Sequence, residues 1–133
     1  MARATILVVD DDQDIVRMLM MRLRTAGYEV LYANDGNEAM RTAEVAIPDL
    51  LIMDIGMPKS DGHDVAKRLR ENSATRRIPI IFLTARMSDK DRLRAFSAGV
   101  SRYLTKPFDS AELLSTVSRA LSCIRPLPFV SSP

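Results

Sequence analysis

Residues 49–62 read Asp-Leu-Leu-Ile-Met-Asp-Ile-Gly-Met-Pro-Lys-Ser-Asp-Gly, and the predicted architecture follows from this stretch. Its apolar run, residues 50–53, has no polar alternation and is too short for a typical helix, which predicts a strand buried on both faces. The run ends in a carboxylate, Asp54. Because open parallel sheets bind ligands outside the carboxyl ends of their strands, Asp54 stands where chemistry is expected.

Four further segments have the composition of strands: residues 5–9, 29–33, 78–83 and 100–104. Between the strands, apolar residues recur at helical spacing. Residues that cap helices occur at the starts of the first, fourth and fifth predicted helices. They are Asp12, then Ser88 with Asp91, then Asp109 with Glu112. Five strands that alternate with five helices predict an α/β fold, a doubly wound parallel sheet with helices on both faces.

The helical spacing also predicts which side chains face the core. The third helix has three apolar residues that should point inward and three basic residues that should point outward: Val65, Ala66 and Leu69, then Lys67, Arg68 and Arg70. The fourth helix is expected to bury Leu93 and Phe96. His63, the one histidine of the chain, is interpreted as a solvent-facing helix residue rather than a ligand or relay.

Composition bounds the class of protein. A chain of 133 residues with 47% hydrophobic and 27% charged residues has the size of one globular domain. We expect that domain at residues 1–122, with 123–133 as a tail or the start of a linker, because Pro126 and Pro128 forbid further helix. No apolar run approaches a membrane span and no signal segment is visible, which predicts a cytoplasmic protein without a membrane partner.

Cysteine and charge exclude two further classes. Cys123 is the only cysteine, so an internal disulfide is impossible, in agreement with a reducing compartment. The net charge is +2, but the basic residues are scattered in pairs such as Arg22 with Arg24, without a basic run. Direct nucleic-acid binding by this domain is therefore not expected.

Four predicted strand ends carry polar side chains: the acidic run Asp10, Asp11 and Asp12, then Asp54, Thr84 and Lys106. Converging carboxylates are a suitable partial cage for Mg²⁺, to which a backbone carbonyl such as that of Gly56 can add. With the negative charge offset by metal and Lys106, Asp54 can act as a nucleophile toward phosphorus. The Thr84 hydroxyl can donate to the same phosphoryl oxygens.

At these residues the chain resembles the receiver domain of two-component response regulators, over residues 5–121. The resemblance rests on four motifs in the family's order: Val-Val-Asp-Asp-Asp (8–12), Met-Asp-Ile-Gly-Met-Pro-Lys-Ser-Asp-Gly (53–62), Phe-Leu-Thr-Ala (82–85) and Tyr-Leu-Thr-Lys-Pro-Phe (103–108). It implies a flavodoxin-like sheet of five strands in the order 2-1-3-4-5.

The resemblance also implies a role for each site residue. Asp54 would accept a phosphoryl group from a sensor histidine kinase or phosphotransfer protein. Asp11 would ligate Mg²⁺ directly and Asp10 through water, with the Gly56 carbonyl as a further ligand. Lys106 would pair with Asp54 and then with the phosphoryl group, and the Lys106-Pro107 bond would be cis.

The same resemblance implies a conformational switch. Thr84 would move toward the phosphoryl group, Tyr103 would follow, and the face of the fourth helix, fifth strand and fifth helix would repack. That face would control a downstream protein or a missing C-terminal output domain, or form a homodimer with Asp91, Arg94 and Arg119 as charge partners. Arg86 is predicted to dominate the lifetime of the phosphorylated state, because Gly56 has no side chain to hold the hydrolytic water.

Two other functions compete with the switch. A phosphohydrolase of the haloacid dehalogenase type also uses an aspartyl phosphate and Mg²⁺, but it requires Asp-x-Asp-x-Thr on the first strand, where this chain has Asp10-Asp11-Asp12-Gln13-Asp14. The other alternative is an interaction module without phosphotransfer, which the intact set of acids, Thr84 and Lys106 does not favour. We therefore expect a phosphoacceptor that acts only on itself rather than an enzyme.

Overall fold

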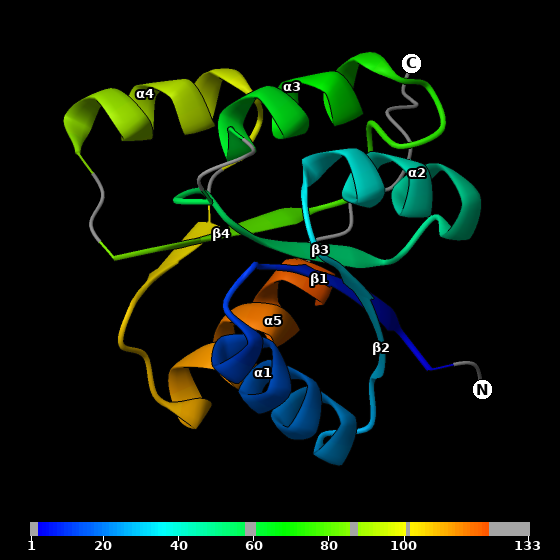
Figure 1. The fold of residues 1–133 in the computed structure, drawn as a ribbon, viewed down its shortest axis with the longest axis vertical. Helices are drawn as coiled ribbons and strands as arrows, with labels where there is room; N and C mark the ends of the chain where they lie inside the picture. Colours follow the sequence, from blue (N-terminus) through cyan, green and yellow to red (C-terminus); the bar gives the residue numbers. More distant parts are fainter. Residues whose placement is uncertain (1–2, 58–60, 86–87, 101, 123–133) are drawn as a thin grey trace.

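The computed structural model describes residues 3–57, 61–85, 88–100 and 102–122. Strands and helices alternate along these residues (Figure 1). In chain order they are β1 (Thr5–Val9), α1 (Gln13–Thr25), β2 (Glu29–Ala33), α2 (Gly36–Ala46), β3 (Leu50–Asp54), α3 (Gly62–Glu71), β4 (Ile80–Thr84), α4 (Asp89–Ser97), β5 (Arg102–Thr105) and α5 (Ser110–Ser122).

The strands form one parallel sheet in the order β2-β1-β3-β4-β5. Helices α2, α3 and α4 cover one face of the sheet, and α1 and α5 cover the other (Figure 1). This is the doubly wound, flavodoxin-like α/β fold that the sequence predicted. Strand order reverses at β1 and β3, and ligands of such sheets bind outside the carboxyl ends of the strands at this point.

Strand β3 is the centre of both hydrophobic cores, and all its residues are buried. Leu51 and Met53 pack under α2 and α3, whereas Leu50 and Ile52 pack under α1 and α5. Side chains of a strand alternate between faces, so one apolar run supplies both layers. The prediction of a strand buried on both faces is confirmed.

The predicted caps form as the sequence indicated. The Asp12 carboxylate accepts hydrogen bonds from the backbone N–H groups of Asp14 and Ile15. Ser88 and Asp91 make a reciprocal capping box at α4, and the Asp109 carboxylate accepts the backbone N–H of Glu112 at 2.7 Å. These bonds satisfy N–H groups that have no partner within the helix.

Two strand boundaries differ from the prediction. Strand β4 begins at Ile80 rather than at residue 78, because Pro79 has no N–H to give to the ladder, although its carbonyl accepts from Leu51 N at 3.0 Å. Strand β5 begins at Arg102 rather than at residue 100. The Val100 N–H is taken by the Ala95 carbonyl at the end of α4, at 2.8 Å.

The prediction that α4 buries Leu93 and Phe96 is wrong. These side chains are 69% and 78% exposed, and Ala95 is the buried residue of the helix. Leu93 with Phe96 and Ala95 with Ala98 are both apolar pairs at a spacing of three residues, so periodicity alone cannot choose between them. Ala95 and Ala98 take the buried positions, and the larger side chains of Leu93 and Phe96 face solvent.

Two predictions for α3 also need correction. His63 is buried, with 5% of its surface exposed, and its ring meets the Phe82 ring edge-on at 5.2 Å between centroids. Arg70 is half-buried rather than outward, because its Nη1 donates to the carbonyls of Ile78 at 2.7 Å and Arg76 at 3.2 Å. Val65, Ala66 and Leu69 face the core as predicted.

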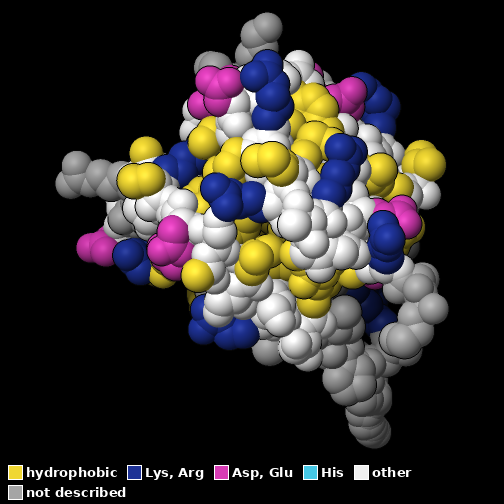
Figure 2. All heavy atoms as spheres, turned by 90° about the horizontal axis from the view of Figure 1, so that it is seen from below, with side chains coloured by type: hydrophobic (Ala, Val, Ile, Leu, Met, Phe, Trp, Pro, Cys, Tyr) yellow, Lys and Arg dark blue, Asp and Glu magenta, His cyan; other side chains and the backbone are white. Residues whose placement is uncertain are grey.

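The face of the molecule formed by α1 and α5 carries dispersed charge. Seen from the side of α1 and α5, the lysine and arginine side chains lie in separate groups among hydrophobic and uncharged surface (Figure 2). Within the described residues, no helix is both long and apolar enough to cross a membrane. The predicted tail, residues 123–133, lies outside the described part of the chain.

Candidate functional site

The predicted site residues meet at the carboxyl edge of the sheet. Asp54 and Thr84 are the last residues of β3 and β4, while Asp10 and Lys106 directly follow β1 and β5. Parallel pairing aligns these ends, with Asp54 opposite Leu83 and Thr84 opposite Thr105. The fold therefore brings together groups that are up to 96 positions apart in the chain.

Three carboxylates form the acidic part of the site. Asp10, Asp11 and Asp54 each offer an oxygen, and these oxygens lie within 4.8 Å of one another. Asp10 is fully buried, Asp54 is 9% exposed and Asp11 is exposed. Hard oxygen ligands with one side open to water suit Mg²⁺, which retains several of its waters when it binds to proteins.

The positive charge of Lys106 partly offsets the negative charge of this cluster. Its Nζ lies 3.3 Å from Asp10 Oδ2 and 3.3 Å from Asp54 Oδ2, and its side chain is 22% exposed. Its backbone N–H donates to the Thr84 carbonyl at 2.7 Å, and the Lys106-Pro107 bond is cis, as the resemblance implied. Burial alone would lower the pKa of Lys106, but the charges of Asp10 and Asp54 outweigh it and raise the pKa.

The buried carboxylate of Asp10 is held at an energetic cost. Burial, joined by the charge of Asp54, raises the pKa of Asp10 above its usual range, although the Asp12 N–H and Lys106 act in the opposite direction. The Asp12 N–H donates to Asp10 Oδ1 at 2.9 Å. One lysine does not fully compensate the carboxylates, so the donor set fits a divalent cation.

Backbone geometry orients Asp54. The Gly56 N–H donates to Asp54 Oδ1 at 2.8 Å, while Oδ2 faces Lys106. The two carboxylate oxygens are thus in different surroundings. The Gly56 carbonyl as a metal ligand and the Thr84 hydroxyl as a donor to phosphoryl oxygens stay predictions, although Thr84 is 5% exposed at the site edge.

Tyr103 lies on β5 with its ring half-buried. Arg92 of α4 donates from Nη1 to the Tyr103 hydroxyl at 2.5 Å, and its guanidinium carbon lies 5.2 Å from the ring centroid. The sequence did not single out Arg92, and its signal would have been a cation on the helix beside the predicted switch tyrosine. Arg86, predicted to govern the phosphorylated lifetime, lies outside the described residues.

A cluster of carboxylates with a lysine, at the switch point of a five-stranded parallel sheet, is the arrangement of a receiver-type domain. The profile of the "Response regulator receiver domain" matches residues 6–118. The chain belongs to this family, the receiver domains of two-component response regulators. Receiver domains are signalling modules and typically not true enzymes.

A characterised relative shows how much of a longer protein the chain resembles. It is 40% identical over 116 residues to the alkaline phosphatase synthesis transcriptional regulatory protein PhoP of Bacillus subtilis, covering 87% of this chain and 48% of that protein. The chain thus spans about half the length of this relative.

Solved structures agree with the fold. The chemotaxis protein CheY4 of Vibrio cholerae superimposes with a TM-score of 0.86 at 38% identity, covering 90% of this chain and 100% of that chain. The receiver domain of sensor histidine kinase PA1611 from Pseudomonas aeruginosa superimposes with a TM-score of 0.83 at 36% identity, covering 91% and 99%. That structure is described with a magnesium ion coordinated in its active site cleft.

Proposed function

We propose that Asp54 is the phosphoacceptor of a Mg²⁺-dependent signalling switch. The observation that carries this proposal is the position of Asp54, whose Oδ2 lies 3.3 Å from Lys106 Nζ while its carboxylate belongs to the cluster with Asp10 and Asp11. A nucleophilic carboxylate beside a fixed cation and a cation-binding pair matches what phosphoryl transfer requires.

The transfer is a displacement at phosphorus. A carboxylate oxygen of Asp54 forms a new O–P bond while the bond from phosphorus to the donor breaks. With a phosphohistidine donor, the P–N electron pair stays on the imidazole nitrogen, which takes a proton. The product is an aspartyl phosphate, an acyl phosphate that water can later hydrolyse to return the carboxylate of Asp54 and inorganic phosphate.

Several residues of the chain prepare this step. Asp10, Asp11 and Asp54 would hold Mg²⁺, with the Gly56 carbonyl as a further ligand; the bound ion neutralises negative charge on the transferring group. Lys106 neutralises the carboxylates first and the phosphoryl oxygens afterwards. The Gly56 N–H fixes the direction of the Asp54 carboxylate through Oδ1.

The readout would be a repacking around the phosphoryl group. Thr84 supplies a hydroxyl donor to its oxygens, and Tyr103 moves behind Thr84, which changes the face of α4, β5 and α5. Leu93 and Phe96 of α4 are exposed apolar side chains. A downstream protein, an output domain after residues 1–122, or a second copy of the chain would bind there.

The proposal also covers the phosphodonor, the compartment and the dephosphorylation of Asp54. The phosphodonor would be a sensor histidine kinase or a phosphotransfer protein in the cytoplasm, and this domain would not bind nucleic acid directly. Chemistry would be restricted to phosphorylation and slow dephosphorylation of Asp54 itself. Arg86 would govern the dephosphorylation rate, and Arg86→Ala, measured by loss of the phosphorylated form, tests that part.

The test is intact-mass spectrometry after incubation with acetyl phosphate, with and without Mg²⁺. The parent chain should gain one phosphoryl group only with Mg²⁺, and hydroxylamine should remove it because acyl phosphates react with this nucleophile. Asp54→Asn should gain none. The control is Asp14→Asn, since the Asp14 side chain is 91% exposed and pairs with Arg17 outside the cluster, and it should behave as the parent.

Two results would overturn the proposal. One is an adduct that persists in Asp54→Asn. The other is the absence of any adduct from folded, Mg²⁺-bound parent chain at all times sampled after mixing, which would favour an interaction module without phosphotransfer.

A further inference from the structure

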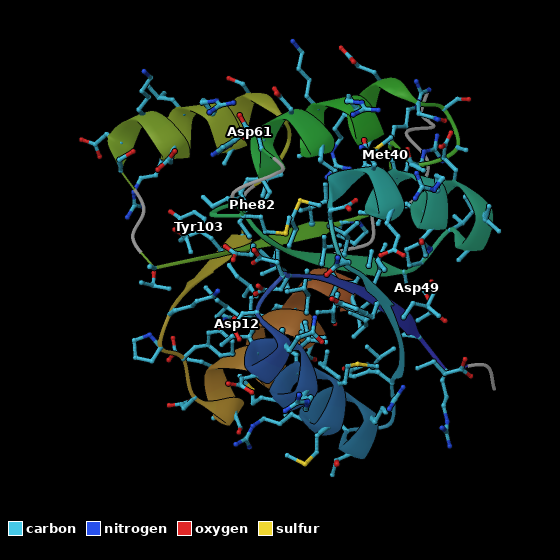
Figure 3. The ribbon with its side chains drawn as sticks, viewed as in Figure 1. Asp12, Met40, Asp49, Asp61, Phe82 and Tyr103 are labelled. Atoms are coloured by element: carbon cyan, nitrogen blue, oxygen red, sulfur yellow. The ribbon has the colours of Figure 1, made fainter. Side chains whose placement is uncertain are left out.

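Helices α2 and α3 form a pocket that the phosphorylation chemistry does not use. Its volume is about 570 Å³, and the buried Met40 is one of its lining residues. Figure 3 shows Met40 on α2, beside α3. The other lining residues that matter here are polar or charged: Arg41 and Glu44 of α2, then Arg68, Glu71 and Asn72 of α3. This pocket is called the α2–α3 groove below.

The charges of the groove lie at two levels along the helices. Both helices begin at the carboxyl edge of the parallel sheet and end at its amino edge, so they run in the same direction. Asn72 Nδ2 donates to Glu44 Oε2 at 2.9 Å, which places Glu44 level with the end of α3, where Glu71 lies. Arg41 and Arg68 each precede the glutamate of the same helix by three residues, about 4.5 Å along the axis.

The groove therefore has a basic pair, Arg41 with Arg68, and an acidic pair, Glu44 with Glu71. All four residues are exposed. Within the residues that the structure describes, neither pair takes part in a salt bridge. A partner that brings the opposite charge to each level would thus meet groups that no counter-charge already holds.

Two further acids on these helices are engaged elsewhere. The Glu38 carboxylate accepts the backbone N–H of Asn34, before the start of α2. Asp64 Oδ1 lies 3.9 Å from Arg94 Nη2 of α4. The basic pair is consequently not neutralised by its own helices.

The acidic pair lies where a helix disfavours negative charge. Glu44 is in the last turn of α2, which has no basic residue, and Glu71 is the last residue of α3, whose last turn contains Arg68 and Arg70. Because the carboxyl end of a helix carries partial negative charge, a carboxylate there is stabilised when a cation approaches it. This effect favours a cationic partner at the acidic pair, most of all at α2.

An apolar side chain stands beside the groove. Val45 of α2 is 87% exposed, and it lies one turn after Arg41 on the same side of the helix. A protein seated across the groove would cover Val45 and remove its apolar surface from water.

We propose that a second copy of this chain binds the α2–α3 groove and forms a two-fold symmetric dimer. A two-fold axis between the two levels brings the basic pair of one copy onto the acidic pair of the other, and the reverse contact forms at the same time. Because the groove is positive at one level and negative at the next, it is complementary to itself. A uniformly acidic or basic partner would satisfy one pair and be repelled by the other.

Pairing through this groove is independent of the proposed phosphorylation. The groove contains none of the carboxylates at the carboxyl edge of the sheet, and α2 takes no part in the proposed repacking. The dimer belongs to the unphosphorylated chain. Its test needs neither a phosphodonor nor Mg²⁺, so its failure would leave the phosphorylation of Asp54 untouched.

The experiment is sedimentation velocity on the unphosphorylated chain over a range of protein concentrations. At low ionic strength the parent chain should pass from monomer to dimer as its concentration rises toward the millimolar range. Added salt should shift the chain back to monomer, because contacts between exposed charges are screened.

Charge reversal identifies the surface that pairs. The acidic-groove variant carries Arg41→Glu with Arg68→Glu, and the basic-groove variant carries Glu44→Arg with Glu71→Arg. Each should self-associate at least about tenfold more weakly than the parent, because like charges then face each other at both levels. An equimolar mixture should form a heterodimer, since every contact again joins opposite charges.

The matched control is Arg22→Glu with Arg24→Glu on α1. Both arginines are exposed, and α1 covers the other face of the sheet. This variant has the same net charge as the acidic-groove variant but an unchanged groove. It should self-associate as the parent does and should not form a heterodimer with the basic-groove variant. Circular dichroism verifies that every variant is folded.

Three results would overturn the proposal. The parent chain would stay monomeric at low ionic strength up to the millimolar range, or the folded groove variants would self-associate as strongly as the parent, or their mixture would form no heterodimer.

Discussion

Asp10 shows at the scale of a single residue how a functional group can reduce stability. It is fully buried, and burial together with Asp54 raises its pKa despite Lys106 at 3.3 Å. The folded chain thus disfavours the charged form relative to the unfolded chain. The stability that Asp10 contributes is greatest below its ordinary pKa of 3.8 and is lost as pH rises through the raised value.

Asp10→Asn should therefore increase the free energy of unfolding of the metal-free chain at pH about 7, where the raised carboxyl pKa disfavours the folded state. Urea denaturation with and without Mg²⁺ is the measurement. Mg²⁺ should stabilise the parent chain through preferential binding to the folded state and stabilise the variant much less. A variant less stable than the parent without Mg²⁺ would contradict this account of Asp10.

The sequence predicted the residues at the strand ends better than those on helix surfaces. Asp54 and Lys106 each follow an apolar strand, so their place at one sheet edge depends only on the strands being parallel. The Arg92–Tyr103 contact and the burial of His63 depend on how far α3 and α4 are rotated about their axes. That rotation is set by packing, which a sequence pattern describes only loosely.

At the scale of elements, α3 and α4 are joined by Asp61 and Arg94. Their side chains approach to 2.8 Å and are 40% and 43% exposed. Burial alone would raise the pKa of Asp61, but the hydrogen bonds from Arg94 and from the His63 N–H outweigh it and lower the pKa. The stability from this group is present above the ordinary carboxyl pKa and is lost as pH falls through the lowered value.

Asp61→Asn should weaken the dependence of the free energy of unfolding on pH in the acidic range. Asparagine is a good N-cap, so the variant removes the charge while keeping the α3 cap. Because the pair is exposed, the loss at neutral pH should be at most about 1 kcal/mol and should vanish at low pH. Unfolding free energies measured at a series of acidic pH values check this; an undiminished difference at low pH would show that the lost cap, not the ion pair, is responsible.

Caps and strands could be predicted at this scale, but the orientation of α4 could not. Ser88 and Asp91 form their capping box because the pattern specifies local hydrogen bonds. Which of Leu93 and Ala95 is buried depends on how the helix packs against the rest of the domain, and the structure buries Ala95. Capping hydrogen bonds join residues that are close in the sequence, whereas the orientation of α4 depends on residues far from it in the sequence.

At the scale of the whole molecule, stability is concentrated in the two layers around β3. Leu51→Ala should lower the free energy of unfolding by about 2–5 kcal/mol, because it removes a fully buried side chain and leaves a cavity. Leu93→Ala makes the same chemical change where the side chain is 69% exposed, and it should cost less than about 0.5 kcal/mol.

Chemical denaturation of both variants checks this contrast. If Leu51→Ala and Leu93→Ala lowered the free energy of unfolding equally, Leu93 would be buried in solution, by the chain itself or by a second copy. The latter case is recognised by a loss that grows with protein concentration.

The fold gives the molecule its function through one edge of one sheet. Crossover connections bring Asp10, Asp54, Thr84 and Lys106 to that edge, and α4 and β5 lie beside it (Figure 1). A charge added at Asp54 is thus next to the least buried helix of the domain, α4, within the part of the chain that the structure describes. This arrangement is the physical basis of the proposed switch.

The identity of the phosphorylated residue tests the central claim most directly. After incubation with acetyl phosphate and Mg²⁺, borohydride reduces an aspartyl phosphate to homoserine, which tandem mass spectrometry of peptides can locate. We predict homoserine at position 54 alone, and none when Mg²⁺ is omitted. Homoserine at another aspartate, or its absence from chain that has gained a phosphoryl group, would contradict the assignment of Asp54 as the phosphoacceptor.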